Sequence, residues 1–450
     1  MNRLLVIGAL ATKLAALRPA AAQPPARRLT LPEAVKLALD NGPEIQSAEE
    51  GVFASETRVQ GTRALRYPKL RTEANVQYWD SPLNVSFSSM PAMGMAPSPT
   101  TPIRDQLTWQ ATISLAQPIS GLFVLNRLVA LERNGVDAAR ADQARARLDT
   151  AQRAAEAYIR LLQARAVASV ADKSVAQVDA QLQRAQVQER AGALGQVDVL
   201  RLTSARDSAR QGQLRARTTV TIATGALALS LDLPTDAALD VVDDLPDPPV
   251  PMTWSEREVA AVASKERPEL TGARERQAQA QANISVTRAQ ILPNIMATAV
   301  YQHTEGQATF VPKNAWFVGG TLSWDLWDWG KISSGVKEAR HRANQASLAA
   351  RTLQDQIVFE AQRRLLEART AYETLAVARS ALQASEEAYR IQSVRFGAGA
   401  ATTTDVLDAE TDVSRARSGY AQARYDYYLT QAALARAVGR LPAMTTGGQR

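Results

Sequence analysis

The sequence predicts a mainly α-helical protein with long coiled α-helical hairpins, four β-strands and an internal duplication. Three observations lead to this prediction. Two long stretches lack proline and almost lack glycine, four runs alternate apolar with polar residues, and landmarks of the first half recur in the second half. The composition agrees, because aromatic residues make up only 5% of the 450 residues, which favours long helices over a compact mixed core.

The N-terminus has the pattern of an export signal. Arg3 precedes an apolar run over residues 4–17, and the small residues before Gln23 fit a cleavage site. Lys13 interrupts the run, so an amphipathic first helix is the alternative interpretation. We expect residues 1–22 to be a signal peptide. No later stretch reaches the ~20 apolar residues that a membrane-spanning helix needs.

The two halves of the chain share short landmarks in the same order, which indicates an internal duplication. The matched pairs are Pro43-Glu44-Ile45 and Pro268-Glu269-Leu270, Thr62-Arg63-Ala64 and Thr287-Arg288-Ala289, Asp198-Val199-Leu200 and Asp405-Val406-Leu407, and Leu233-Pro234 and Leu441-Pro442. We expect a first repeat over residues 23–235, a Pro/Asp-rich linker over 236–251, a second repeat over 252–442 and a polar tail over 443–450. Each repeat is expected to hold a helix, two strands and a long helical hairpin.

Very long helices are predicted in each repeat. Leu122–Ala191 contains no proline and only one glycine, and Lys331–Phe396 has the same property. At about 1.5 Å per residue, either run can extend on the order of 100 Å. A stripe that recurs every seven residues marks both runs and predicts supercoiled packing against a neighbouring helix. Its members are Leu161, Ala168, Val175 and Leu182 in the first run, and Ala368, Leu375, Leu382, Tyr389 and Phe396 in the second.

Four runs of alternating residues predict β-strands. Each is about ten residues long, with an apolar face, a polar face and aromatic residues near its ends, which is typical of membrane barrel strands. The residues of the apolar faces are Leu70, Thr72, Ala74, Val76 and Tyr78; Leu107, Trp109, Ala111, Ile113 and Leu115; Ile295, Ala297, Ala299 and Tyr301; and Trp316, Val318, Leu322, Trp324 and Leu326. A half-buried sheet in a soluble protein is the alternative. Four strands cannot close a barrel, so placement in a membrane requires several subunits to share one.

The composition excludes several kinds of site. The chain has no cysteine, which excludes thiolate nucleophiles, disulfides and Cys-type zinc sites. Its net charge of +7 comes from basic residues scattered beside acidic ones, so no nucleic-acid surface is expected. Met90, Met93 and Met95 offer soft ligands for Cu(I), although a surface loop is the simpler interpretation. His303 and His341 are expected at a strand end and on a helix surface. We expect no metal, no cofactor and no enzymatic activity, since phosphate-binding and nucleophile motifs are lacking.

The order of these parts resembles the TolC family of outer-membrane efflux channels over nearly the whole mature chain. The most specific stretch is Phe396–Gly399 leading into Asp405–Ala409, which is similar to the periplasmic-tip motif of that family. Pro268–Leu270, Leu292–Pro293 and Trp324–Gly330 are further landmarks. The resemblance implies a homotrimer, a 12-stranded barrel made of four strands from each subunit, and a helical tunnel across the periplasm. It also implies contact with outer-membrane lipid and docking to an inner-membrane pump through a periplasmic adaptor protein.

The resemblance assigns Asp405 and Asp408 to the paired aspartates at the constricted end of the tunnel. Three residues apart on a helix, they lie on one face. In a trimer they would form a ring of carboxylates, which favours cations in a narrow opening. The alternative is a solvated pair at a helix start, where Asp405 caps the helix. Ala401 stands where some members of the family carry an arginine, so the gate network of the family does not transfer whole.

The first repeat differs at the matching place. Asp198 answers Asp405, but Arg201 answers Asp408. We expect Arg201 to pair with an aspartate of the other hairpin when the tip is closed. Phe396 stands where the family more often has a tyrosine, and it lacks that hydroxyl group. The predicted periplasmic gate therefore consists of Asp405, Asp408, Asp198, Arg201 and Phe396.

The adaptor is expected to dock on the two hairpin turns, around Gly192 and Gly195 in the first repeat and Gly397 and Gly399 in the second. The predicted function is an exit duct for small molecules in the cell outer membrane, with a long periplasmic extension. The outer-membrane component of a type I protein secretion system is one alternative. A soluble periplasmic coiled-coil adaptor is the other, and it is less favoured because an adaptor would have one hairpin flanked by lipoyl-like or small-barrel modules.

Overall fold

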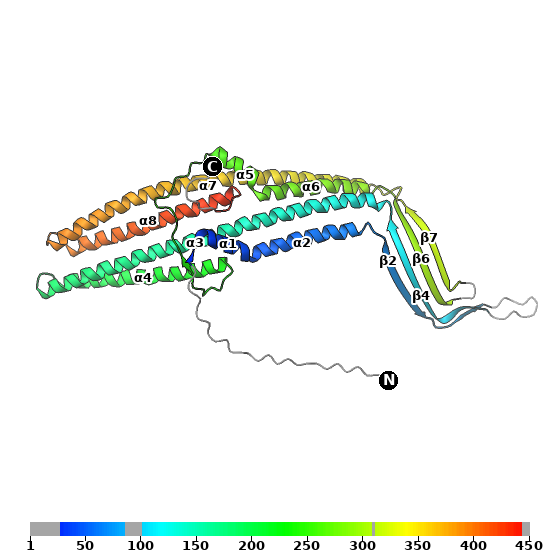
Figure 1. Cartoon of the computed structure of the whole chain (residues 1–450), viewed down its shortest axis with the longest axis horizontal. Coiled ribbons are helices and arrows are strands. Elements are labelled where there is room, and N and C mark those ends of the chain that lie inside the picture. Colours follow the sequence, from blue (N-terminus) through cyan, green and yellow to red (C-terminus); the bar gives the residue numbers. More distant parts are fainter. Residues whose placement is uncertain (1–27, 86–100, 308–310, 443–450) are drawn as a thin grey trace, which may run out of the picture.

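The computed structural model describes residues 28–85, 101–307 and 311–442 (Figure 1). It shows an elongated molecule with long helices side by side at one end and a β-sheet at the other. The predicted signal peptide (1–22), the loop with Met90, Met93 and Met95, and the predicted polar tail (443–450) lie outside the described residues.

The two halves of the chain contain helices of closely similar length in the same order. In chain order, the elements of the first half are β1 (Arg28–Leu29), α1 (Leu31–Asn41), α2 (Pro43–Ala64), β2 (Lys69–Tyr78), β3 (Leu83–Val85), β4 (Thr101–Pro118), α3 (Gly121–Arg190) and α4 (Gln196–Ser230). Those of the second half are β5 (Asp240–Val241), α5 (Glu256–Glu266), α6 (Pro268–Ala289), β6 (Asn294–Gln307), β7 (Asn314–Ser323), α7 (Lys331–Gly397) and α8 (Thr403–Ala437). Helices α2 and α6 both have 22 residues, and α4 and α8 both have 35.

Local sequence explains where several helices begin. Pro43 and Pro268 occupy the first positions of α2 and α6, where the missing N–H of proline costs nothing. Ser255 and Thr402 form capping boxes at α5 and α8, in which each side chain accepts a hydrogen bond from the third residue of its helix. Among the described residues, no helix combines the length and the hydropathy that crossing a membrane requires.

The long helices pack through the predicted seven-residue stripes. All four stripe residues of α3 are buried. In α7, Ala368 and Leu375 are buried, whereas Leu382, Tyr389 and Phe396 are only half-buried. The packing of α7 therefore loosens toward the hairpin turn that joins it to α8.

The sheet is antiparallel with the strand order β2-β4-β6-β7, and the short β3 pairs with β4. The apolar faces of the four long strands lie on the same side of the sheet. Leu70 lies opposite Leu115, Leu115 opposite Ala299, and Ala299 opposite Val318. One apolar face therefore runs across all four long strands. Within the described residues β2 and β7 each have one unpaired edge.

The predicted end of the last strand was wrong. Strand β7 ends at Ser323, so Trp324 and Leu326 lie in the turn that leads to α7. Ser323 pairs with Asn294, the first residue of β6, and Asn294 follows Pro293, which has no N–H for a ladder. The strand therefore stops where its partner begins.

One face of the helical layer is covered by the linker and the two-stranded β1–β5 pair. The Tyr158 hydroxyl donates hydrogen bonds to the Leu29 carbonyl at 2.8 Å and the Val242 carbonyl at 2.6 Å. On α8, the Tyr425 hydroxyl donates to Asp243 at 2.7 Å. These hydrogen bonds hold the tyrosine-bearing faces of α3 and α8 against the linker. The opposite faces of the two helices are therefore turned away from it.

A buried ion-pair network joins α3, α6, α7 and α8. The Arg267 side chain is 4% exposed and contacts Glu269 at 2.9 Å and Glu360 at 3.0 Å. Arg436 contacts the same Glu269 at 2.9 Å and Asp149 on α3 at 2.7 Å. The two halves of the chain are thus tied together at mid-length by charges that share partners.

Candidate functional site

The two hairpin turns lie together at the end of the molecule farthest from the sheet (Figure 1). Gly192 and Gly399 occupy equivalent places and both have φ of +73°, a conformation that glycine adopts without strain. The next residue of each turn closes it, since the Ala193 N–H donates to Gln188 at 2.9 Å and the Ala400 N–H donates to Arg395 at 2.8 Å. Gly192, Gly195, Gly397 and Gly399, the residues predicted for docking, are all exposed.

Asp405 and Asp408 are exposed on the first turns of α8. One Asp405 carboxylate oxygen accepts hydrogen bonds from the Thr402 backbone N–H and hydroxyl, both at 2.8 Å. These bonds from Thr402 hold the pKa of Asp405 below its usual range. Within one chain, Asp405 therefore helps to cap the start of α8, which was the alternative interpretation. Asp408 faces solvent one turn later.

Arg201 connects the two hairpins through a hydroxyl group. Its guanidinium donates to the Thr404 hydroxyl on α8 at 3.3 Å and lies 3.9 Å from Asp198 on its own helix. The predicted pairing of Arg201 with an aspartate of the other hairpin when the tip is closed stays a prediction. The structure brings Arg201 and Asp198 next to the start of α8.

An apolar contact supports the polar one. Leu407 packs against a small cluster of the first hairpin that includes Leu182 and Leu202, while Phe396 is half-buried at the end of α7. The residues predicted for the gate therefore occupy one region of the molecule, contributed by α4, α7 and α8.

A buried carboxyl group near the tip was missed by the sequence analysis. Glu410 is only 3% exposed and lies between α3, α7 and α8. The Ser174 hydroxyl donates to it at 3.2 Å, and the Tyr389 hydroxyl also donates to it. A signal was available, because Val406 and Val413, one turn before and after it, are the buried residues of the same helix face.

The Gln177 side chain adds a further polar contact to this carboxyl group. Its amide NH₂ group donates to the two Glu410 oxygens at 3.1 and 3.3 Å. Glu410 is therefore surrounded by donors from α3 and α7.

Burial is the main reason that the pKa of Glu410 rises to about 7. Desolvation disfavours the charged form, and the hydrogen bonds from Ser174 and Tyr389 and the charge of Arg417 offset only part of this effect. Glu410 therefore changes its protonation state near neutral pH, in the region where the two hairpins meet.

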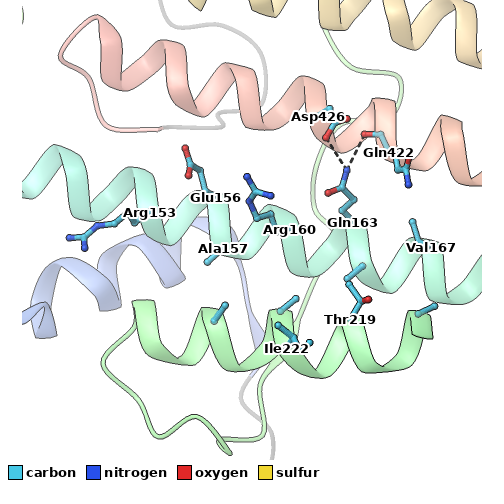
Figure 2. Close-up of a pocket in the computed structure, with 14 residues that line it drawn as sticks. Arg153, Glu156, Ala157, Arg160, Gln163, Val167, Thr219, Ile222, Gln422 and Asp426 are labelled. Carbon is cyan, nitrogen blue, oxygen red and sulfur yellow. Dashed lines mark hydrogen bonds between the residues drawn. The ribbon is translucent and has the colours of Figure 1, made fainter. Parts of the chain in front are cut away.

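A groove of about 690 Å³ lies on the helical face turned away from the linker. Figure 2 shows Arg153, Glu156 and Arg160 of α3 along it, with Ile222 of α4 opposite them. Gln163 spans toward α8, where it donates to Asp426 at 2.9 Å. This groove is thus lined by both apolar and charged side chains, and no described segment covers it.

The described residues contain no group of three or more His, Asp or Glu side chains that could hold a metal ion. His303 lies within β6, opposite the first residue of β7, where its Nδ1 is 2.7 Å from Asn314 Oδ1 and its ring packs on Trp109. His341 is exposed on α7.

Comparisons with known proteins agree with this architecture. Residues 34–232 and 260–440 match the family described as "Outer membrane efflux protein". The chain is 22% identical over 428 residues to the outer membrane efflux protein BepC of Brucella suis biovar 1 (strain 1330), with 93% of this chain and 87% of BepC covered.

Solved structures of outer membrane channels have a similar fold. The CmeC channel of Campylobacter jejuni matches with a TM-score of 0.75 and 17% identity, covering 91% of this chain and 85% of CmeC. The open state of the MtrE channel of Neisseria gonorrhoeae matches with a TM-score of 0.72 and 18% identity, covering 93% of this chain and 91% of MtrE.

Proposed function

Because the chain belongs to the outer membrane efflux protein family, we propose that it is the exit duct of a tripartite efflux system. The resemblance to TolC-like channels that the sequence predicted is confirmed, and with it the location in the outer membrane. In the proposed function, an inner-membrane pump and a periplasmic adaptor deliver small molecules to the duct, which carries them outward. Energy is supplied by the pump, and the duct itself is passive.

The observation that carries this proposal is the exposed apolar face of a sheet with two open edges. Within the described residues, no helix packs extensively on the strands, and Leu70, Val76, Trp316 and Val318 on this face are exposed, which counts against a half-buried soluble sheet. Unpaired backbone groups are costly in lipid. We infer that β7 of one subunit pairs with β2 of the next, which closes a barrel of 12 strands in a homotrimer.

The helices have matching open edges. In the order α4-α3-α8-α7, the outer helices α4 and α7 each have one side that no other described helix covers (Figure 1). Both sides carry exposed apolar residues, among them Leu214 and Leu229 on α4 and Phe359 and Val377 on α7. The same rotation that joins the strands would pack α4 against α7 of the neighbour, so that the wall with Arg160 and Asp426 faces the enclosed tunnel. The equal lengths of corresponding helices favour a duplication over residues 23–235 and 252–442.

The tip is the proposed gate of this tunnel. Asp405 and Asp408 would place three carboxylate pairs around its mouth, with Asp198, Arg201 and Phe396 beside them. Adaptor docking on the turns at Gly192, Gly195, Gly397 and Gly399 opens the tip only if the adaptor binds the open state more tightly than the closed state.

Single-channel conductance in planar bilayers tests the duct and the gate together. Wild type is compared with the double variant Asp405→Asn/Asp408→Asn, and Asp412→Asn on the same helix is the control, because Asp412 is exposed and paired with Arg415 at 2.8 Å. We expect cation-selective currents that a multivalent cation blocks in wild type and control but not in the double variant. Equal block in all three would remove these aspartates from the gate, and absence of membrane insertion would contradict the duct itself.

A further inference from the structure

Trp79 and Arg104 form a stacked pair at the end of the sheet that lies farthest from the helices, where β2 ends and β4 begins (Figure 1). The guanidinium carbon of Arg104 lies 3.6 Å from the centroid of the Trp79 ring. At this distance the positive charge is attracted to the face of the indole, and the planar guanidinium stacks on it. These two residues are called the rim pair below.

The rim pair lies on the polar face of the sheet. The Trp79 backbone N–H donates to the Gln106 carbonyl at 2.7 Å, which continues the pairing of β2 with β4 by one residue. Alternate side chains of a strand point to the same face, so Trp79 shares the polar face of Gln77. Its indole N–H donates to the hydroxyl of Thr108, on the polar face of β4, at 3.1 Å. In the proposed duct the apolar face meets lipid, so the rim pair lies inside the barrel at its outer mouth.

A bulge in β4 sets the position of Arg104. Arg104 and Trp109 are both paired with β6, but residues 105–108 between them lie opposite only Gly306. Gly306 has φ of +79°, and an added Cβ would lie 2.2 Å from the Leu107 carbonyl oxygen, so glycine is required where β4 comes this close. Because bulges re-aim the side chains beside them, the local backbone holds Arg104 beside the Trp79 ring.

The charge of Arg104 has no acidic partner within the described part of the chain. One of its Nη atoms donates to the Ser81 carbonyl at 3.5 Å, and its buried Nε has no hydrogen bond. The nearest acids in the sequence are directed elsewhere, since Asp80 accepts from the Ser81 N–H at 2.9 Å and strand alternation turns Asp105 to the opposite face. A guanidinium without a carboxylate partner has donors left for an anion, which it binds through charge-assisted hydrogen bonds.

Other charged residues near the outer mouth leave this positive charge uncompensated. Glu305 is paired with Lys313 at 3.0 Å, and the sequence of residues 86–100, between β3 and β4, contains no charged side chain. In the proposed homotrimer, three rim pairs would place three guanidinium groups around the mouth. Rings of arginine side chains favour anions in a pore.

We propose that the rim pair is a binding site for organic anions at the outer mouth of the duct, where Arg104 binds a carboxylate, sulfonate or phosphate group. This inference rests on the proposed function, because it assumes that the polar face of the sheet lines the barrel. Trp79 orients the guanidinium by stacking, so its loss weakens the site without removing the charge. The exit of the duct then attracts anions, whereas the carboxylates proposed at the tip attract cations.

Binding of a fluorescent pyrene trisulfonate dye to the purified protein in an uncharged detergent tests the proposal. The fluorescence anisotropy of the dye gives its Kd, and planar-bilayer conductance of the same preparations shows whether they form channels. Arg104→Gln removes the charge, and Trp79→Leu removes the stacking ring but keeps the charge. Lys313→Gln is the matched control, because it removes one positive charge at the same end of the sheet from a side chain that is 70% exposed and paired with Glu305.

We expect Arg104→Gln to raise the Kd of the dye by about tenfold or more, because charge-assisted hydrogen bonds to the anion are lost. Trp79→Leu should raise it roughly threefold, and Lys313→Gln should change it by less than about twofold.

An equal Kd in Arg104→Gln and wild type, or no binding of the dye to wild type, would overturn the proposal, and channels formed by these preparations would leave the proposed duct intact. If Arg104→Gln does not assemble, an unchanged Kd in Trp79→Leu counts against the site in the same way. Absence of conductance in wild type would contradict the duct itself and hence the proposed function.

Discussion

Replacing Glu410 by glutamine should make the protein more stable at alkaline pH. Glu410 is buried between α3, α7 and α8, and the groups that face it are Ser174 and Gln177 on α3, Tyr389 on α7 and Arg417 on α8. Arg417 is itself paired with Glu386 at 3.0 Å, which weakens its attraction for the carboxylate. Glutamine keeps the size of the side chain and, like the protonated acid, carries no charge.

The magnitude follows from the raised pKa. Glu410 has a pKa of about 7 in the folded protein instead of the usual 4.5, so the folded state binds the proton more tightly than the unfolded state. The resulting stabilisation is fully present below pH ~4.5 and is lost as the pH rises through ~7. At about 1.4 kcal/mol per pH unit, the loss is about 3 kcal/mol per subunit. The Glu410→Gln variant has no such proton and should not show this loss.

Denaturant unfolding of the purified protein in detergent between pH 5 and pH 8.5 measures the effect. The difference in unfolding free energy between Glu410→Gln and wild type should grow by about 3 kcal/mol per chain over this range. Asp412→Asn is the matched control, because its side chain is on the same helix but exposed, and its difference from wild type should stay constant. A Glu410→Gln difference that does not change with pH would refute the argument that this carboxyl group is neutral when buried.

Other substitutions have definite expected outcomes. Arg267→Met should lower the free energy of unfolding by about 3 kcal/mol, because it removes the buried arginine that contacts both Glu269 and Glu360, whereas the exposed Arg415→Met should have little effect in the same unfolding experiment. Gly399→Ala should cost about 1 kcal/mol because of its positive φ, and Gly397→Ala, where an added Cβ meets no atom within 4 Å, should cost less; equal losses would contradict the strain argument. Thr402→Val removes the hydroxyl donor to Asp405 and should raise the pKa of that carboxyl group. The carboxylate then takes up its proton at a higher pH than in wild type. When the pH is lowered, block of the channel by a multivalent cation should therefore be lost earlier in the variant.

The parts of the fold that depend on local sequence could be predicted. Helix α3 spans Gly121–Arg190, which is close to the predicted range Leu122–Ala191. Nothing inside this range interrupts the helix, because it contains no proline and only one glycine. The end of β7 could not be found in this way. Alternation continues through Trp324 and Leu326, but a strand needs a partner, and β6 begins only at Asn294.

The polar contacts between the hairpins were also hard to predict, because they depend on which segments lie side by side in the folded chain. The sequence analysis did not single out Glu410, although Val406 and Val413 mark its helix face as buried. The contact of Arg201 with Thr404 depends on how the two hairpins lie against each other, and the pairing of Arg201 with an aspartate at a closed tip stays a prediction. Spacing along one helix therefore identifies the buried face, but it does not identify the partner across the interface.

The contacts between the two hairpins change in character along the molecule, and this limits where the tip can open. Near the linker, α3 contributes Tyr158, Ile159 and Leu161 to a large buried core, and separating such surfaces costs about 25 cal/mol for each Å² exposed. Toward the tip the apolar contacts shrink to the small cluster that includes Leu182, Leu202 and Leu407, and polar contacts stand beside it, at Glu410 and between Arg201 and Thr404. Water can replace polar contacts at small net cost, so separation of the hairpins should begin at the turns and stop where the apolar core begins. Glu410 stands at this transition, which is why its protonation is expected to affect the tip more than the rest of the tunnel.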